Sequence, residues 1–322
     1  MVRFVRYEVN GSPQWAKVKD VIHETGDDFL VHASHIDISH KRFGYEFLGK
    51  RLEDAREKHS VTVDRRNILP VIPDFQGPSW AVGLNYFSHA QATGQLEKPV
   101  RPDPPVWFIK GEPSAHLSPI VLPPAWSGQG LTEGTYSGQV DFEVELVIVV
   151  GQTIMNVDPE NALSFVAGYS VGNDVSDRFL QGVDVFQDKK KAERFRPNAQ
   201  WGPGKTLYTF SPHGPFIATD VDSSSLDIRL MVNGEVRQQG NTSEMMYTAA
   251  ELLANISRHR RIPAGTTIYC GTPKGTAVEA TFGDNPQPAR YLKIGDRVEA
   301  TIRDIGSLVN VVTAPPQLVF PR

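Results

Sequence analysis

Apolar and polar residues alternate over the first 20 positions of the chain, on both sides of Asn10-Gly11. A period of two is typical of a half-buried strand, and Asn-Gly is a favoured two-residue turn between antiparallel strands. The pattern therefore predicts an N-terminal β-hairpin. Further along, Leu48 and Leu52 stand four residues apart, a spacing that indicates a short helix over residues 44–57.

Short β-branched runs separated by Gly and Pro dominate the chain beyond residue 78. They predict strands at residues 144–150, 226–232, 266–270, 297–303 and 308–313. One helix is expected to begin at Pro159, with Asp158 as its cap and Ala162, Phe165 and Val166 on its apolar face. Another is expected after Thr248, where Thr248-Ala-Ala-Glu251 matches a capping box. Many short strands with few helices indicate a mainly β fold with mixed α+β character.

A change of pattern near Pro70 and Pro73 suggests a boundary between two parts of the chain. We expect a small N-terminal domain over residues 1–75 and a larger domain over residues 76–322. Residues 125–139 are rich in Gly, Ser and Thr, which predicts a loop. Residues 183–199 are polar and charged, so we expect either a surface helix or a flap beside a functional site.

Three carboxylates alternate with apolar residues in the segment that leads into the strand predicted at 144–150. Because successive side chains of a strand point to opposite faces, Asp141, Glu143 and Glu145 should share one face. Such acids repel one another unless positive charge lies nearby, so the face is either solvated beside Lys and Arg or holds a metal ion. The apolar continuation of the strand favours burial and hence the metal. Oxygen ligands suit Mg²⁺, Mn²⁺ or Ca²⁺.

The composition is that of an ordinary globular protein, with 322 residues of which 40% are hydrophobic and 22% charged. A net charge of −4 offers no basic excess for a nucleic-acid surface, so we expect a small-molecule partner and no nucleic acid. One cysteine, Cys270, permits no intrachain disulfide, disfavours zinc and fits a small core residue. The chain has no apolar run of roughly 18 residues and no signal-like N-terminus, so we expect a cytoplasmic protein without a membrane partner.

Several short motifs, read in order, resemble the fumarylacetoacetate hydrolase (FAH) family and span residues 80 to 312. They are Gly83-Leu-Asn-Tyr-Phe-Ser-His89-Ala, Asp141-Phe-Glu-Val-Glu-Leu146, Gly168-Tyr-Ser-Val-Gly-Asn-Asp-Val-Ser176, Gly204-Lys205, Val232-Asn-Gly-Glu-Val-Arg-Gln238, Asn241-Thr-Ser243 and Gly271-Thr-Pro-Lys-Gly275. The resemblance implies a β-sandwich roll catalytic domain preceded by a small N-terminal domain, and a homodimer.

The resemblance also implies the residues of an active site. It implies Mg²⁺ or Mn²⁺, with Ca²⁺ in some members, held by Glu143, Glu145 and Asp174. Taken alone, Asp174 lies in a turn-forming run and would be assigned a structural role. The matching catalytic positions are His89, Lys205 and Gln181, and the matching substrate-binding positions are Tyr86, Arg178 and Thr272.

The chemistry implied by this site is that of 2-oxo and β-dicarbonyl acids. Such an acid can bind a metal through its carboxylate and keto oxygens, and the metal stabilises an enolate. C–C bond hydrolysis of an acylpyruvate-type (2,4-dioxo acid) substrate is the leading expectation, and it needs a base to activate water. Decarboxylation, tautomerisation or a hydratase/lyase reaction needs the same enolate. A non-catalytic binding protein is a further alternative, against which the intact carboxylates and Lys205 argue.

One position departs from the family pattern. The hydrolases carry a glutamate three residues after the histidine that matches His89, and this chain has Ala92 there. Glu97 and Glu112 are candidate replacements, and the substitution favours the reactions that need no attacking water. His116 is interpreted as a loop histidine rather than a replacement acid–base group. Lys110 is interpreted as a solvated charge at a strand end.

Overall fold

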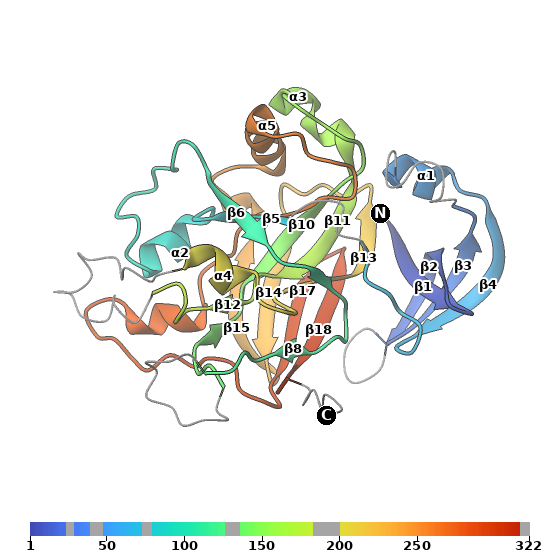
Figure 1. Cartoon of the computed structure of the whole chain (residues 1–322). Helices are drawn as coiled ribbons and strands as arrows, with labels where there is room; N and C mark the ends of the chain where they lie inside the picture. The colour runs from blue at the N-terminus through green and yellow to red at the C-terminus, as the bar shows by residue number, and fades with distance from the viewer. Residues whose placement is uncertain (24–28, 39–47, 73–78, 126–135, 183–199, 316–322) are drawn as a thin grey trace, which may run out of the picture.

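The computed structural model describes residues 1–23, 29–38, 48–72, 79–125, 136–182 and 200–315. Two β-sheets pack face to face at the centre, with short helices around them (Figure 1). The fold is therefore mainly β, as the pattern predicts. Across the described residues, no helix has the length and apolar character needed to cross a membrane.

The N-terminal strands form one end of the larger sheet (Figure 1, blue). They are β1 (Val2–Val9), β2 (Ser12–His23), β3 (Leu30–Ile36) and β4 (Glu57–Asp64). Asn10 and Gly11 have φ angles of 49° and 74°, which confirms the predicted hairpin turn between β1 and β2. Helix α1 (Leu48–Asp54) buries Leu48 and Leu52, and it covers the described part of the helix predicted over 44–57.

The larger sheet continues from β1 into the body of the protein, because β1 pairs antiparallel with β13. Its strand order is β4-β3-β2-β1-β13-β11-β10-β16-β5-β6, with β7 also on β13. The bounds of these further strands are β5 (Ser79–Gly83), β6 (Val106–Lys110), β7 (Pro113–Ser114), β10 (Val144–Val150), β11 (Val166–Asn173), β13 (Ser211–Thr219) and β16 (Thr267–Tyr269). Hydrogen bonds between β1 and β13 join the two parts of the chain into one sheet. The division into two domains at residue 75 stays a prediction.

The second sheet has five strands in the order β15-β14-β17-β18-β8. They are β8 (Ile120–Val121), β14 (Asp227–Val232), β15 (Glu235–Asn241), β17 (Arg297–Ile302) and β18 (Gly306–Thr313), and a separate pair joins β9 (Val140–Asp141) to β12 (Ser176–Asp177). All five strands predicted beyond residue 78 are confirmed, with ends that differ by at most two residues.

Helices lie at the margins of the two sheets. They are α2 (Phe87–Ala92), α3 (Pro159–Ala162), α4 (Trp201–Lys205) and α5 (Ala249–His259), with short 3₁₀ turns η1 (Leu163–Phe165), η3 (Thr242–Glu244) and η4 (Ala277–Thr281). The capping box of Thr248 and Glu251 is present and confirms α5. The helix predicted after Asp158 is only four residues long, because the chain tightens into η1 and enters β11 at Val166.

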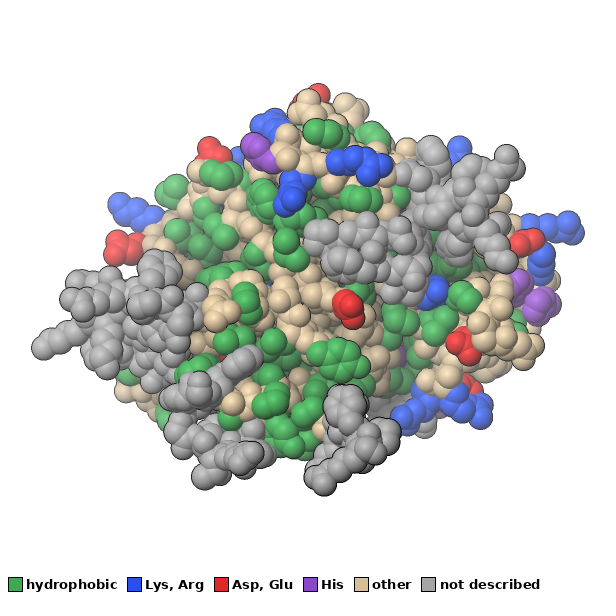
Figure 2. All heavy atoms as spheres, viewed as in Figure 1, with side chains coloured by type: hydrophobic (Ala, Val, Ile, Leu, Met, Phe, Trp, Pro, Cys, Tyr) green, Lys and Arg blue, Asp and Glu red, His purple; other side chains and the backbone are tan. Residues whose placement is uncertain are grey.

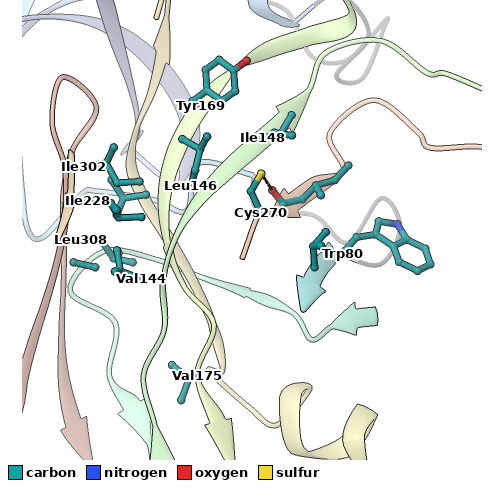
Figure 3. Packing of buried hydrophobic residues seen from close by; sticks show 14 of the residues in the cluster. Trp80, Val144, Leu146, Ile148, Tyr169, Val175, Ile228, Cys270, Ile302 and Leu308 are labelled. Atoms are coloured by element: carbon teal, nitrogen blue, oxygen red, sulfur yellow. Dashed lines mark hydrogen bonds between the residues drawn. The ribbon is translucent and has the colours of Figure 1, made fainter. Parts of the chain in front are cut away.

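Strand β10 is buried on both faces, and this determines where the site lies. Val144, Leu146 and Ile148 belong to the main hydrophobic core. Figure 3 shows Val144 and Leu146 near Ile228, Ile302 and Leu308, and Ile148 nearer Cys270. The odd-numbered residues face the other way, with Val147 against Ala81, Tyr269 and Phe108. Glu145 shares that second face, so its carboxylate is enclosed by protein.

Cys270 is part of the same core, as expected from its apolar context. Its thiol is fully buried and donates a hydrogen bond of 3.7 Å to the carbonyl of Ile268 (Figure 3). Burial raises the pKa of this thiol above its ordinary value. The side chain therefore acts as a small core residue and not as a nucleophile.

Charged side chains are unevenly spread over the face shown in Figure 2. Lys and Arg lie mainly over the helices at the top and over the N-terminal strands at the right, while hydrophobic and uncharged side chains dominate the middle. The described residues visible on this face thus form no continuous basic surface. Of the loops expected from sequence, most of 125–139 and all of 183–199 fall outside the described residues.

His116 is a structural residue at the contact between the N-terminal strands and the second sheet. Its Nδ1 accepts a hydrogen bond of 3.1 Å from the backbone N–H of Val309, and its ring lies edge-on to Phe29 at 5.0 Å between centroids. It is 2% exposed and does not line the cavity described below. Burial lowers the pKa of His116 to about 3 and that of the fully buried His213 to about 4.

These two histidines predict a pH-dependent stability. An unfolded histidine takes up a proton near pH 6.5, whereas the folded protein keeps both rings neutral to a lower pH. The unfolded state thus binds more protons, and the free energy of unfolding falls as pH drops below about 6.5, with each histidine adding up to about 1.4 kcal/mol per pH unit. Urea unfolding at several pH values checks this: His116→Gln should flatten the slope, and the exposed-site control His23→Gln should not. Equal slopes for wild type and His116→Gln would contradict the assignment.

Candidate active site

The pairing of β10 with β11 brings three carboxylates together. Val144 pairs with Asn173, and the backbone N–H of Asp174 donates a hydrogen bond of 2.8 Å to the carbonyl of Glu143. One carboxylate oxygen from each of Glu143, Glu145 and Asp174 lies within 4.8 Å of the others, and all three residues are buried. Strand alternation predicts that Glu143 and Glu145 are neighbours. The position of Asp174 depends on the register of a second strand.

Asp141 is not a member of this triad, although the alternating pattern places it on the same face. Residues 142 and 143 interrupt the strand between β9 and β10. The Asp141 carboxylate accepts hydrogen bonds from the backbone N–H groups of Ala277 and Val278, at 2.8 and 3.0 Å, and from Nε of Arg178 at 2.9 Å. It therefore orients Arg178 and binds the start of η4.

Three buried cations surround the triad. The Lys205 ammonium donates to Glu143 Oε2 at 2.6 Å and to Asp174 Oδ2 at 2.8 Å, and the Arg178 guanidinium donates to Glu143 Oε1 at 2.5 Å. Lys110 Nζ lies 2.6 Å from Asp174 Oδ1. The interpretation of Lys110 as a solvated charge is wrong, because β6 ends against the core and buries the side chain completely. Burial lowers the pKa of Lys110 to about 8, against the opposing effect of Asp174.

The charges do not balance at Glu145. Burial would raise the pKa of Glu143, but Arg178 and Lys205 hold it below its ordinary range. Glu145 makes no ion pair with any described residue, and burial, followed by the charges of Asp174 and Glu143, raises its pKa well above the ordinary value. A buried carboxylate with surplus negative charge is what a divalent cation would neutralise.

The loop after β16 supplies the hydrogen bond that Glu145 does have. The backbone N–H of Gly271 donates to Glu145 Oε2 at 2.7 Å. Gly271 has a φ of +92°, and a Cβ there would lie 2.7 Å from Cβ of Asn85, so only glycine fits this approach. With three oxygen donors and no sulfur or imidazole among them, the triad fits Mg²⁺ or Mn²⁺, and Ca²⁺ by the same chemistry.

A cavity of about 380 Å³ opens on the triad. The sequence-predicted residues that line it are His89, Glu143, Glu145, Asp174, Arg178, Gln181, Lys205 and Thr272. Its apolar wall is formed by Val82, Leu84, Phe108, Trp201, Val278 and Phe282. Tyr86 is the one predicted site residue that the structure does not bring to the cavity: it is fully buried behind the wall, and its hydroxyl has no hydrogen-bond partner among the described residues.

Gln181 and Thr272 present polar groups at the rim of the triad. Gln181 Oε1 accepts a hydrogen bond of 2.9 Å from Arg178, whereas its Nε2 is buried without a partner in the described part of the chain. Thr272 Oγ1 donates to the carbonyl of Val144 at 2.9 Å and accepts from Gln238 at 2.8 Å. Gln181 thus keeps a free donor beside the cavity, while Thr272 fixes the loop that holds Glu145.

His89 has a carboxylate partner that sequence reasoning missed. Its Nδ1 lies 2.5 Å from Oε1 of Glu279, a residue of η4 that stands 190 positions further along the chain. The two expected replacements, Glu97 and Glu112, are exposed and do not contact it. The only local signal is Thr276-x-x-Glu279, a capping-type spacing after the Gly271–Gly275 motif. That spacing predicts a turn but says nothing of His89.

A β-sandwich with a buried carboxylate triad, three cations and a histidine–carboxylate pair around one cavity is typical of an enzyme active site, and its carboxylate oxygens are of the kind that suit a hard metal ion. The family model "Fumarylacetoacetate (FAA) hydrolase C-terminal" matches residues 79–313. The chain belongs to the fumarylacetoacetate hydrolase family.

Three known proteins illustrate the similarity. The human oxaloacetate tautomerase FAHD2A, mitochondrial, is 34% identical over 271 residues, which are 79% of this chain and 76% of that protein. The 2-hydroxyhepta-2,4-diene-1,7-dioate isomerase of Mycobacterium marinum has a TM-score of 0.70 at 26% identity and covers 98% of this chain and 100% of its own. The fumarylpyruvate hydrolase of Pseudomonas aeruginosa, solved with Mn²⁺ and pyruvate, has a TM-score of 0.56 at 28% identity and covers 74% and 90%.

The absence of an ion-pair partner for Glu145 among the described residues leads to a testable prediction. Replacing it by the uncharged isostere in Glu145→Gln should stabilise the metal-free protein at pH 8 by at least about 1 kcal/mol, because the buried repulsion is removed. The same change should abolish the rise in melting temperature on adding Mn²⁺. Differential scanning fluorimetry with and without EDTA measures both effects. A variant that is less stable without metal, or that keeps the Mn²⁺ response, would contradict a metal role for Glu145.

Proposed function

We propose that this protein is a Mg²⁺- or Mn²⁺-dependent enzyme that hydrolyses a C–C bond of an acylpyruvate-type 2,4-dioxo acid. The observation that carries the proposal is that the carboxylate triad and the His89–Glu279 pair line or adjoin one cavity. Acid–base catalysis needs a base within reach of the reacting group. An imidazole held by a carboxylate beside a metal site satisfies that need.

The protein residues have separable tasks in this reaction. The cation, held by Glu143, Glu145 and Asp174, would supply Lewis-acid polarisation of the substrate's oxygens. Around it, Lys205 and Arg178 provide positive charge for a substrate carboxylate, and the free Nε2 of Gln181 donates a hydrogen bond.

Proton transfer falls to His89. Its ring takes a proton from water, the water oxygen attacks C4, and the C3–C4 bond breaks with its electron pair left on C3. Return of the proton to C3 completes pyruvate, and the acyl group leaves as a carboxylic acid. The apolar wall, which includes Phe108, Trp201 and Phe282, suits an uncharged acyl group.

Keto–enol tautomerisation of a 2-oxo acid is the second candidate. The human relative is named an oxaloacetate tautomerase and is 34% identical over 271 residues. The reaction moves one proton between C3 and the C2 oxygen, so His89 suffices without an attacking water. Ala92 stands where the hydrolases carry a glutamate. This difference is compatible with hydrolysis, because Glu279 supplies a carboxylate to His89. No observation favours a decarboxylase or a hydratase/lyase reaction over hydrolysis and tautomerisation.

Other sequence-based expectations stay predictions. We propose a homodimer in the cytoplasm, acting on a small acid without a nucleic-acid or membrane partner. Sedimentation of the purified protein tests the first of these directly, since a dimer has about twice the 35.7 kDa mass of one chain.

Two substrates separate the candidate reactions. With acetylpyruvate, we expect the enol absorbance to disappear while acetate and pyruvate form in equal amounts without CO₂. EDTA should abolish this activity, and Mg²⁺ or Mn²⁺ should restore it. Glu143→Gln, which removes a triad carboxylate, serves as the inactive control.

With oxaloacetate, accelerated keto–enol exchange without pyruvate or CO₂ would identify a tautomerase. Full activity in EDTA would contradict the metal-dependent mechanism for either reaction.

A further inference from the structure

We propose that Asn85 is a positioning residue for the cation site: it orients the carboxylate of Glu145 through the peptide bond between Cys270 and Gly271. The inference rests on the proposed function, since it takes Glu145 as a ligand of the metal. It goes beyond that function by assigning a task to a residue that does not line the cavity. The observations that carry it are two hydrogen bonds made by the opposite ends of one peptide group.

This peptide group lies where strand β16 ends. The strand ends at Tyr269, and the backbone N–H of Cys270 donates a hydrogen bond of 2.9 Å to the carbonyl of Leu146 on β10. The Cys270 carbonyl and the Gly271 N–H follow, in a part of the core where a backbone polar group needs a partner. Side chains provide both partners.

The two ends of the peptide group connect Asn85 to Glu145. Nδ2 of Asn85 donates to the Cys270 carbonyl at 2.7 Å, and the Gly271 N–H donates to Oε2 of Glu145 at 2.7 Å. Because a peptide group is planar, a bond that fixes its carbonyl also fixes the direction of its N–H. Hydrogen bonds in such a chain also polarise and strengthen one another. Asn85 thus acts on Glu145 through one rigid unit.

Asn85 is itself held in a single orientation. Its Nδ2 donates a second hydrogen bond of 3.0 Å to the carbonyl of Tyr247, and its Oδ1 accepts one of 2.8 Å from the Tyr247 N–H. The side chain is 2% exposed, and these bonds use both Nδ2 hydrogens and the amide oxygen. A reversed carboxamide would turn its oxygen toward two carbonyl oxygens, so the donor must face Cys270.

The result is a carboxylate with one oxygen held and the other open. Oε2 of Glu145 is bound by Gly271, whereas its Oε1 has no hydrogen bond to any residue in the described ranges. Glu145 also lines the cavity. A carboxylate that is restrained on the protein side is oriented in advance for a cation on the cavity side.

A simpler alternative is that Asn85 only joins two segments of the fold. Its backbone carbonyl accepts a hydrogen bond of 2.7 Å from the N–H of Met246, and its side chain bonds to Tyr247, so it connects the start of α2 to the segment before α5. In that case its loss would lower the stability of the protein. The affinity for a cation and the environment of the Cys270–Gly271 peptide would not change.

Metal affinity separates the two alternatives. We expect Asn85→Ala to raise the Kd for Mn²⁺ at least about tenfold, because the residues that orient metal ligands typically contribute 10- to 100-fold to metal affinity. Electron paramagnetic resonance of free Mn²⁺, recorded on folded protein, measures this. The matched control is Ser257→Ala: Ser257 is buried on α5 and also bonds two backbone groups, of Val157 and Ala254, at 3.1 and 2.9 Å. It should lose stability and keep the wild-type Kd. An unchanged Kd in Asn85→Ala overturns the proposal.

A second measurement needs neither metal nor activity. The chain has a single cysteine, so labelling the cysteine carbonyl with ¹³C and glycine with ¹⁵N makes the Cys270–Gly271 peptide the one labelled pair in an HNCO spectrum. Hydrogen bonds move both its carbonyl carbon and its amide proton to low field. Asn85→Leu, which keeps a side chain of similar size without donors, should move both signals to higher field, and Ser257→Ala should leave them in place.

An amide proton of Gly271 that keeps its position in Asn85→Leu overturns the proposal, as does a wild-type amide proton at ordinary field. If both signals behave as expected but the wild-type protein binds no Mn²⁺, the proposed metal-dependent function fails. The role of Asn85 in orienting Glu145 then stands.

Discussion

Burial of like charges is the constraint on which the rest of this structure depends. Asp141, Glu143, Glu145 and Asp174 are each at most 4% exposed, at one end of the β10–β11 pair. Carboxylates so placed would ionise only at great cost without positive charge. Lys110, Lys205 and Arg178 supply part of it and contact every one of the four except Glu145. The residual charge at Glu145 is the physical argument for a divalent cation.

The sandwich makes that arrangement possible. β10 presents Val144, Leu146 and Ile148 to the second sheet, and this packing fixes the strand against the core. Its other face is closed by Val147 against Tyr269, just beyond Glu145. Glu145 is therefore held on a strand packed on both faces, while Glu143 and Asp174 adjoin the paired ends of β10 and β11. A rigid, dry site strengthens each electrostatic interaction in it.

Local pattern predicted the parts of the fold that depend on local chemistry. Alternation identified β10 and the N-terminal hairpin, and the capping box of Thr248 located α5. The apolar face expected for the helix after Asp158 includes Phe165 and Val166, but α3 ends at Ala162 because tertiary pairing takes Val166 into β11.

Sequence patterns identified the site residues that share a strand or a family motif. They did not identify the residues that tertiary packing brings to the site. Glu143 and Glu145 follow from alternation, while Asp174 came only through the family resemblance. The neighbours of Lys110 along the sequence do not indicate burial, so the pattern predicts a solvated charge where the fold buries the side chain. Glu279 was missed because its partner lies 190 residues away, and only the tertiary fold brings η4 to α2.

We propose that the triad binds a divalent cation in front of His89, whose Nδ1 contacts Glu279. A crystal structure of the protein with Mn²⁺ and oxalate, with anomalous scattering to locate the metal, tests it most directly. The account predicts one Mn²⁺ bound by Glu143, Glu145 and Asp174, oxalate completing its coordination toward Lys205 or Arg178, and His89 still paired with Glu279. Anomalous signal elsewhere, or none with the Lys205 ammonium still bridging Glu143 and Asp174, would contradict it.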